Sequence, residues 1–381
     1  MLSKGRIMVL KNLKIVLDNS VIEKGYLIFE NGLIVKVGIG EYDGKGKDCK
    51  GLIAMPGFID IHLHGSAGID FMDAKEDDYK LIANSLYSEG ITTFLATTLT
   101  SDKESLARVC KTVKNVINDV PSLGGIHFEG PYINVKYKGA QNEKYIRNPD
   151  YFEFNELQKL SGNNIKYITL APEKEGAIDF IKTVTKNGVI VSVGHSDATF
   201  DEVKTAIEVG LTNVTHTHNA MSPHHHRNPG VVTAAFYYNE LFTEFICDKI
   251  HVCPNALATS YKIIGPNRFI MITDALKIKN SDMNTFQLFG LDCVRKNGAA
   301  YLASGPLAGS LLTMDQALRN MREITNADLC DLARISSKNA AKSLKFFDRG
   351  EIKVGNLADV VLLNERLELK ATYKLGEEVF K

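Results

Sequence analysis

The sequence predicts a (β/α)8 TIM barrel with a small β-sandwich domain built from both ends of the chain. Short alternating apolar runs separated by turns occupy both ends, whereas apolar β-branched segments alternate with helix-period segments in the middle. The 381 residues exceed one small domain but suit a barrel plus an accessory domain. We expect residues 1–53 and 346–381 to form the small domain and residues 54–345 the barrel.

The two ends of the chain have the same strand-rich pattern. Near the start, the runs "RIMVLKNLKIVL", "GYLIFENGLIVKVG" and "KGLIA" are separated by turn residues, and "ENG" after Phe29 is a hairpin signal. Near the end, "GEIKVGNLADVVLLNERLELKATYKLGEEVF" continues in the same way. The simplest arrangement is one β domain whose strands close across the base of the barrel.

The middle of the chain supplies eight strands with intervening helices. We expect strands at residues 57–65, 91–98, 125–131, 166–173, 189–197, 213–221, 242–252 and 269–276. We expect helices at residues 75–89, 103–118, 176–187, 201–209, 254–264 and 313–324. This count favours the barrel. A doubly wound open sheet is the alternative, but no glycine-rich phosphate loop follows the first strand to favour it.

Composition excludes several classes of partner. Lysine plus arginine and aspartate plus glutamate are equal at 45 each, so no overall field attracts nucleic acid or an anionic membrane. The six cysteines form no CxxC pair, which is typical of free thiols in a reducing cytoplasm. No signal peptide and no apolar run of membrane-spanning length are recognisable. We expect a cytoplasmic protein without nucleic-acid or membrane partners.

Histidines and acids concentrate where the predicted strands end. In a barrel these ends meet at one mouth, and residues two apart on a strand face the same side. Imidazole and carboxylate ligands suit zinc, iron, manganese, nickel or cobalt, so we expect a divalent metal site. His127, one layer below the mouth, is expected to be a hydrogen-bonded core histidine. The strand-end set is His62, His64, Glu129, His195, His216 and Asp274.

Motifs along the whole chain resemble one family. The segments "PGFIDIHLHG", "HFEGPYIN", "GHSDAT", "THTHNAM", "DKIHV", "ITDA" and "LAGS" are similar in order and spacing to those of N-acetylglucosamine-6-phosphate deacetylases of the amidohydrolase superfamily. "PGFID" with "HLHG" marks only the superfamily, whereas "HFEGP", "GHSDAT" and "HNAM" are more specific. The resemblance implies the same barrel and split β domain.

The resemblance also implies metal ligands. Glu129, His195 and His216 match the ligands of the metal found throughout the family. His62 and His64 match the pair that, with Glu129 and Asp274, holds a second metal in some members, so one or two divalent ions per subunit are expected. Many superfamily relatives bridge two metals with a carboxylated lysine, but Lys166 lies at the wrong end of its strand, which favours Glu129 as the bridge.

Substrate residues follow from the same resemblance. Arg227 matches an arginine that grips the sugar phosphate, a role suited to guanidinium, and family members are commonly homodimers in which the partner subunit can supply phosphate contacts. Gln141 stands where some members carry a histidine that polarises the acetyl carbonyl; glutamine donates a hydrogen bond but cannot be cationic. The other implied substrate residues are Ala140, Asn219, Ala220, His251, Leu307 and Ala308. The loop run His224–His226 is either a polar turn or an addition to the phosphate site.

The implied reaction is hydrolysis of N-acetylglucosamine 6-phosphate to glucosamine 6-phosphate and acetate. Asp274 is the candidate for both proton transfers, and its apolar strand is expected to orient the carboxylate and raise its pKa. An enzyme for the galactosamine epimer is a close alternative. A cyclic amide hydrolase or nucleobase deaminase of the superfamily, and a non-catalytic barrel, are more distant ones.

Overall fold

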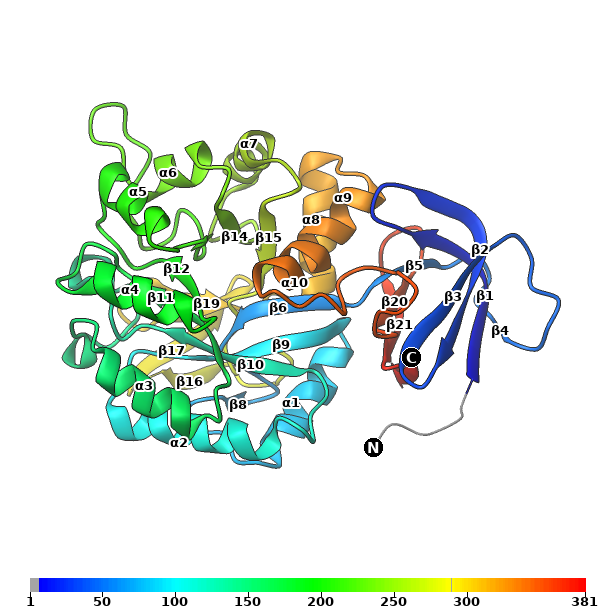
Figure 1. Ribbon diagram of the computed structural model, residues 1–381, viewed down its shortest axis with the longest axis horizontal. Coiled ribbons are helices and arrows are strands. Elements are labelled where there is room, and N and C mark those ends of the chain that lie inside the picture. The colour runs from blue at the N-terminus through cyan, green and yellow to red at the C-terminus, as the bar shows by residue number, and fades with distance from the viewer. Residues whose placement is uncertain (1–6, 289) are drawn as a thin grey trace.

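The computed structural model describes residues 7–288 and 290–381, and its centre is a barrel of eight parallel strands (Figure 1). Neighbouring strands follow one another in chain order, unlike the reversed order of a doubly wound sheet. The eight predicted strands are all present, which confirms the fold class. They are β6 (Phe58–Leu63), β9 (Ile91–Thr98), β10 (Leu123–Glu129), β11 (Ile165–Leu170), β12 (Ile190–Val193), β13 (Asn213–Val214), β14 (Phe242–Ile246) and β15 (Phe269–Ile272).

The seam between the last and first strands closes through specific hydrogen bonds. The backbone N–H of Asp274 donates to the carbonyl of His62 at 2.8 Å. The hydroxyl of Thr273 donates to a carboxylate oxygen of Asp60 at 2.6 Å, and both side chains are fully buried. These bonds bring the end of β15 against the end of β6, so residues more than 200 positions apart in sequence share one rim.

Helices surround the barrel (Figure 1). The predicted helices are present as α1 (Asp78–Tyr87), α2 (Lys103–Val116), α4 (Ala177–Lys186), α5 (Phe200–Glu208), α7 (Pro254–Ile264) and α8 (Met314–Thr325). Additional helices, not predicted, are α3 (Tyr151–Leu160), α6 (Val231–Tyr237), α9 (Leu329–Ala333) and α10 (Asn339–Ser343), with a π turn, η3 (Arg334–Lys338), between the last two. The apolar face of α3 is narrow, with only Phe154 and Leu157 buried, whereas α6, α9 and α10 have only five to seven residues each, too few to show a helical period.

The small domain is one eight-stranded sheet from both ends of the chain, beside the barrel in Figure 1. The rings of Phe29 and Tyr373, from strands that are not neighbours in the sheet, lie 6.0 Å apart, so the sheet folds over its own apolar cluster. The predicted boundaries between the small domain and the barrel stay a prediction. The strands are β1 (Ile7–Val16), β2 (Val21–Glu30), β3 (Leu33–Ile39), β4 (Lys47–Asp48), β5 (Ile53–Pro56), β20 (Val360–Leu363), β21 (Leu369–Lys374) and β22 (Glu377–Phe380).

The predicted hairpin joins β2 to β3. Asn31 and Gly32 form the two-residue turn with φ of +52° and +80°. Both central residues of a type I′ turn need positive φ, which asparagine and glycine tolerate best. Glu30 therefore pairs with Leu33 across the turn.

A second small sheet was not predicted. It is antiparallel and consists of β16 (Thr285–Leu288), β17 (Leu291–Lys296), β18 (Ala299–Leu302) and β19 (Leu307–Ser310). The backbone N–H of Ser310 donates to the carbonyl of Asp274 at 2.9 Å, which anchors this sheet at the barrel mouth. A shorter pair, β7 (Gly65–Ser66) and β8 (Ile69–Asp70), follows the first barrel strand.

All six cysteines are free, and only Cys253 is exposed. Within residues 7–288 and 290–381, no helix has both the length and the apolar character needed to cross a bilayer.

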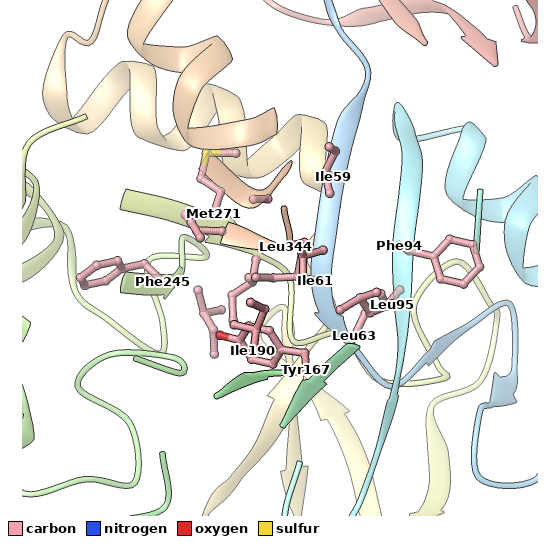
Figure 2. Packing of buried hydrophobic residues seen from close by; sticks show 14 of the residues in the cluster. Ile59, Ile61, Leu63, Phe94, Leu95, Tyr167, Ile190, Phe245, Met271 and Leu344 are labelled. Carbon is pink, nitrogen blue, oxygen red and sulfur yellow. The ribbon is translucent and has the colours of Figure 1, made fainter. Parts of the chain in front are cut away.

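Apolar packing holds the barrel strands to one another and to the helices. Figure 2 shows Ile59, Ile61 and Leu63 along β6 beside Leu95 of β9. Phe94 points to the opposite side of β9 from Leu95, and its ring stacks on Phe71 at 5.8 Å between centroids. This packing keeps the strands in place, and the strand ends carry the polar residues described below.

We expect Phe94→Ala to lower the free energy of unfolding by about 3–5 kcal/mol, because it opens a cavity at a fully buried site. Denaturant unfolding followed by circular dichroism measures the change. Phe152→Ala is the matched control, since that ring is 84% exposed and its removal should change stability by less than about 0.5 kcal/mol. Equal effects of the two substitutions would contradict the packing described here.

Candidate active site

The candidate ligands lie at the carboxyl ends of five barrel strands. His62 belongs to β6 and His64 follows it, while Glu129 is the last residue of β10. His195, His216 and Asp274 follow β12, β13 and β15 with φ of +49°, +29° and +47°, a region that residues other than glycine rarely adopt. Such strain costs about 1–3 kcal/mol per residue and concentrates at functional sites.

One oxygen of Glu129 is the meeting point of three imidazoles. Its Oε1 lies 3.2 Å from Nε2 of His62 and 3.1 Å from Nε2 of both His195 and His216. The Nε2 atoms of His195 and His216 are themselves only 3.0 Å apart.

A second group lies beside the first, and His62 contacts the carboxylates of both. Nε2 of His64 is 3.1 Å from Oδ1 of Asp274, and Nε2 of His62 is 3.5 Å from that same oxygen. Glu129, His195 and His216 form one set with metal-ligand spacing, and His62, His64 and Asp274 form another.

The donor chemistry of this cluster fits a cation. The carbonyl of Tyr137 can only accept a hydrogen bond, so Nδ1 of His195, 2.8 Å away, carries a proton, and in the neutral ring Nε2 points inward as a lone pair. Within the described part of the chain, Nε2 of His62 has no hydrogen-bond partner although it is fully buried. Converging lone pairs on nitrogen and carboxylate oxygen are what a divalent metal ion binds.

The same contacts determine the direction of the carboxylate pKa values. Burial raises the pKa of Glu129, but His62, His195 and His216 outweigh burial and hold it well below its ordinary value. Burial likewise raises the pKa of Asp274, yet His62 and His64 lower it below the ordinary value. The expectation that the pKa of Asp274 is raised was therefore wrong, because the sequence pattern shows the apolar strand but not the imidazoles that face it.

His127 is a core histidine, as expected. Its Nδ1 donates to the carbonyl of Ile61 at 3.0 Å, and its Nε2 accepts from the hydroxyl of Thr169 at 2.7 Å. Burial and neighbouring imidazoles hold its pKa well below the ordinary value, so it is neutral. Both ring nitrogens are occupied, and His127 has none left for a metal.

A cavity of about 170 Å³ opens above the cluster. Nearly all of the predicted site residues line it, including those contributed by the unpredicted sheet through β19. Leu99, Gly139, Leu288 and Gly309 complete the lining without having been predicted. The predicted residues in its wall are His64, Glu129, Ala140, Gln141, His195, His216, Asn219, Ala220, His251, Asp274, Leu307 and Ala308.

Hydrogen bonds at the amide oxygen and at the amide nitrogen hold the side chain of Gln141 in place. Its Oε1 accepts from the backbone N–H of Thr100 at 2.8 Å, which can only donate, so its amide nitrogen must face the other way. That nitrogen donates to Oε2 of Glu129 in a short hydrogen bond. Gln141 therefore binds the carboxylate of Glu129 and orients it.

Several residues of the histidine-rich segment 215–230 lie away from this cavity. Arg227 is exposed and lines a separate surface hollow together with His225. Nδ1 of His225 accepts from the backbone N–H groups of Arg227 and Asn228 at 3.3 and 3.1 Å, so this histidine stabilises the turn. Nε2 of His218 hydrogen-bonds the hydroxyl of Ser260 at 2.8 Å.

Lys166 lies at the start of β11 and donates to the carbonyl of Asn163 at 3.0 Å, far from the strand end. The geometry thus leaves Glu129 as the carboxylate between the two ligand groups.

Two acidic residues that the sequence reasoning missed support site histidines. Asp248 accepts from Nδ1 of His251 at 2.6 Å, which directs the opposite edge of that ring away from Asp248. Burial lowers the pKa of His251, but Asp248 raises it above the ordinary value. Glu244 is fully buried in β14 and contacts His62. The sequence signal that could have identified Glu244 is a carboxylate within the otherwise apolar run "FTEFI".

The fold and the cluster together define a class: (β/α)8 hydrolases that hold a metal ion among histidines and carboxylates at the carboxyl ends of barrel strands. The chain belongs to the Amidohydrolase family, whose sequence model matches residues 53–379. This family is metal-dependent, and both ligand groups described above have the composition to hold such an ion.

Individual relatives cover nearly the whole chain. It is 40% identical over 342 residues to the N-acetylglucosamine-6-phosphate deacetylase of Lysinibacillus sphaericus, covering 89% of this chain and 87% of that relative. It is 35% identical over 384 residues to the enzyme of that name from Bacillus subtilis, covering 98% and 97%. A solved mutant N-acetyl-D-glucosamine-6-phosphate deacetylase from Mycobacterium smegmatis, in complex with N-acetyl-D-glucosamine-6-phosphate, has a TM-score of 0.95 at 29% identity and covers 99% and 100%. The resemblance inferred from the motifs is confirmed.

We expect the protein to bind Zn²⁺ or Co²⁺ and to lose thermal stability when the ion is removed, because the native cluster binds the ion and the unfolded chain does not. An ion present at a hundred times its Kd adds about 2.7 kcal/mol. Differential scanning calorimetry of chelator-dialysed protein, before and after the ion is restored, measures the shift. A His195→Ala/His216→Ala double variant, which keeps only the His62, His64 and Asp274 group, should show a smaller shift. Equal melting temperatures of the loaded and stripped wild-type protein would contradict the metal site.

Proposed function

We propose that this protein hydrolyses N-acetylglucosamine 6-phosphate to glucosamine 6-phosphate and acetate. The observation that carries the proposal is the histidine–carboxylate cluster in the wall of a single cavity, in a chain similar to N-acetylglucosamine-6-phosphate deacetylases over almost its entire length. We place the reaction in the cytoplasm, with no nucleic acid or membrane as partner.

The cluster holds one or two divalent ions of the zinc, iron, manganese, nickel and cobalt group. Glu129, His195 and His216 hold the first, and His62, His64 and Asp274 hold a second beside Glu129. When bound, such an ion polarises the amide carbonyl and lowers the pKa of a coordinated water to about 7.

Asp274 carries the protons in this reaction. Both carboxylate oxygens of Glu129 already have partners. Three imidazoles lie beside Oε1, and Gln141 donates a hydrogen bond to Oε2. Asp274 meets His62 and His64 through Oδ1 and lines the cavity, so it also has an oxygen to take the proton from the attacking water. It then delivers this proton to the departing amine.

The outer part of the cavity binds the sugar. His251 is held by Asp248 and reaches a sugar hydroxyl, while Asn219 and the backbone of Ala220 face the substrate. The N-acetylgalactosamine 6-phosphate reaction remains the alternative, because the two substrates differ only in the orientation of one hydroxyl. A neutral cyclic amide or nucleobase is a weaker alternative, because such a ring has no phosphate for Arg227.

We expect Asp274→Asn to reduce acetate release by at least about a hundredfold, because the amide cannot accept or deliver the proton. Acetate is measured with N-acetylglucosamine 6-phosphate and with its galactosamine epimer as substrates, and elemental analysis follows the metal. Faster turnover of the gluco substrate supports the proposal, and faster turnover of the galacto substrate supports the alternative. Wild-type activity in the variant would refute the role of Asp274.

We further propose that the protein is a homodimer in which Arg227 serves the partner's cavity, because Arg227 does not line the cavity of its own chain. Heterodimers of Asp274→Asn with Arg227→Ala, isolated through two different tags, should regain about half of the wild-type activity. Only a contribution across the interface leaves one of the two sites complete. If each Arg227 serves its own chain, both sites stay defective and the heterodimer stays inactive.

A further inference from the structure

Glu244 lies inside the barrel, below the cluster, and its side chain is fully buried. One carboxylate oxygen accepts the hydroxyl of Tyr167 in a short hydrogen bond. The other lies 3.1 Å from Nδ1 of His62 and 3.4 Å from the backbone N–H of His216. Glu244 thus joins three further barrel strands, and two of its partners belong to the two candidate ligand groups.

These contacts determine the protonation of the His62 ring. The backbone N–H of His216 can only donate, so the oxygen that receives it acts as an acceptor. Nδ1 of His62 approaches that same oxygen and must therefore carry the ring proton. In the neutral ring, which is the form that binds a metal ion, Nε2 is then the lone pair that points at Glu129 and Asp274.

The charge of Glu244 has no fixed cation beside it. Among the described residues, no lysine or arginine forms an ion pair with this carboxylate, and His62 is its only ion-pair contact. A buried carboxylate without a compensating charge is strongly unfavourable. Elsewhere in the chain, the fully buried Glu89 meets Lys279 at 2.9 Å. With no such partner at Glu244, the compensating positive charge has to come through His62 and the cluster that His62 faces.

We propose that Glu244 is a positioning residue that fixes His62 as a metal ligand and sets the metal affinity of the His62, His64 and Asp274 group, with Tyr167 holding Glu244 in place. The inference rests on the proposed metal-dependent function. Metal-binding histidines commonly donate their second N–H to a carboxylate, and losing that partner costs about 10–100-fold in affinity or activity.

The substitution Glu244→Gln separates charge from shape. The amide oxygen can still accept from His62 and from the backbone of His216, while the amide nitrogen can donate to the oxygen of Tyr167. The fold should therefore survive, but the negative charge behind His62 is lost. Titration of stripped protein with Co²⁺ in competition with a chromophoric chelator, together with the visible absorption of bound Co²⁺, measures affinity without reference to activity.

We expect Glu244→Gln to weaken Co²⁺ binding by about 10–100-fold for the ion held by the His62 group, and to change its visible absorption, with less effect on the ion held by Glu129, His195 and His216. Tyr167→Phe removes one hydrogen bond to Glu244 and should weaken the same ion to a smaller extent. It provides an independent test if Glu244→Gln does not fold.

Glu89→Gln is the matched control. It also neutralises a fully buried glutamate, but one paired with Lys279, so it should lower the melting temperature while the Co²⁺ titration stays that of the wild type. Wild-type Co²⁺ affinity in folded Glu244→Gln or Tyr167→Phe would overturn the proposal. Failure of the proposed function has a different signature: the wild-type protein would bind Co²⁺ but release no acetate from N-acetylglucosamine 6-phosphate.

Discussion

The structure depends on the convergence of lone pairs at Oε1 of Glu129. Three imidazole nitrogens lie within 3.2 Å of that oxygen, and the neutral ring of His195 reaches it with a lone pair. Electron-rich atoms at such distances repel one another in a buried site. Only positive charge among them makes the arrangement favourable, so the cluster is organised for a cation, and the supporting hydrogen bonds follow from that requirement.

The barrel supplies the rigidity that this convergence needs. His195, His216 and Asp274 have left-handed backbone conformations directly after their strands, and strain of this kind persists only where surrounding structure holds it. The seam bond between Asp274 and His62 ties the last strand to the first. The stability of the packed strands is therefore what places strained residues from separate strands at one rim.

Much of the barrel and of the ligand cluster could be predicted from the sequence, because the periodicity of apolar residues and the order of strands and helices are visible there. Apolar β-branched runs predict the eight buried strands. Because the carboxyl ends of barrel strands meet at one mouth, the sequence also predicts that His62, Glu129 and His216 lie together. The sheet containing β19 was not predicted, because its strands are half exposed and give no continuous apolar run. The pKa of Asp274 was predicted in the wrong direction, because desolvation follows from an apolar strand whereas facing imidazoles are a tertiary property.

The outer anchors of the histidines make the two halves of the cluster unequal. His195 donates to the neutral carbonyl of Tyr137, whereas His62 donates to the carboxylate of Glu244. A carboxylate makes the imidazole behind it a stronger electron donor than a carbonyl does. On the cavity side, Gln141 donates to Glu129 and withdraws electron density from the shared ligand. The two halves therefore differ in the group behind their histidines, a neutral carbonyl for His195 and a carboxylate for His62, although both halves are built from the same residue types.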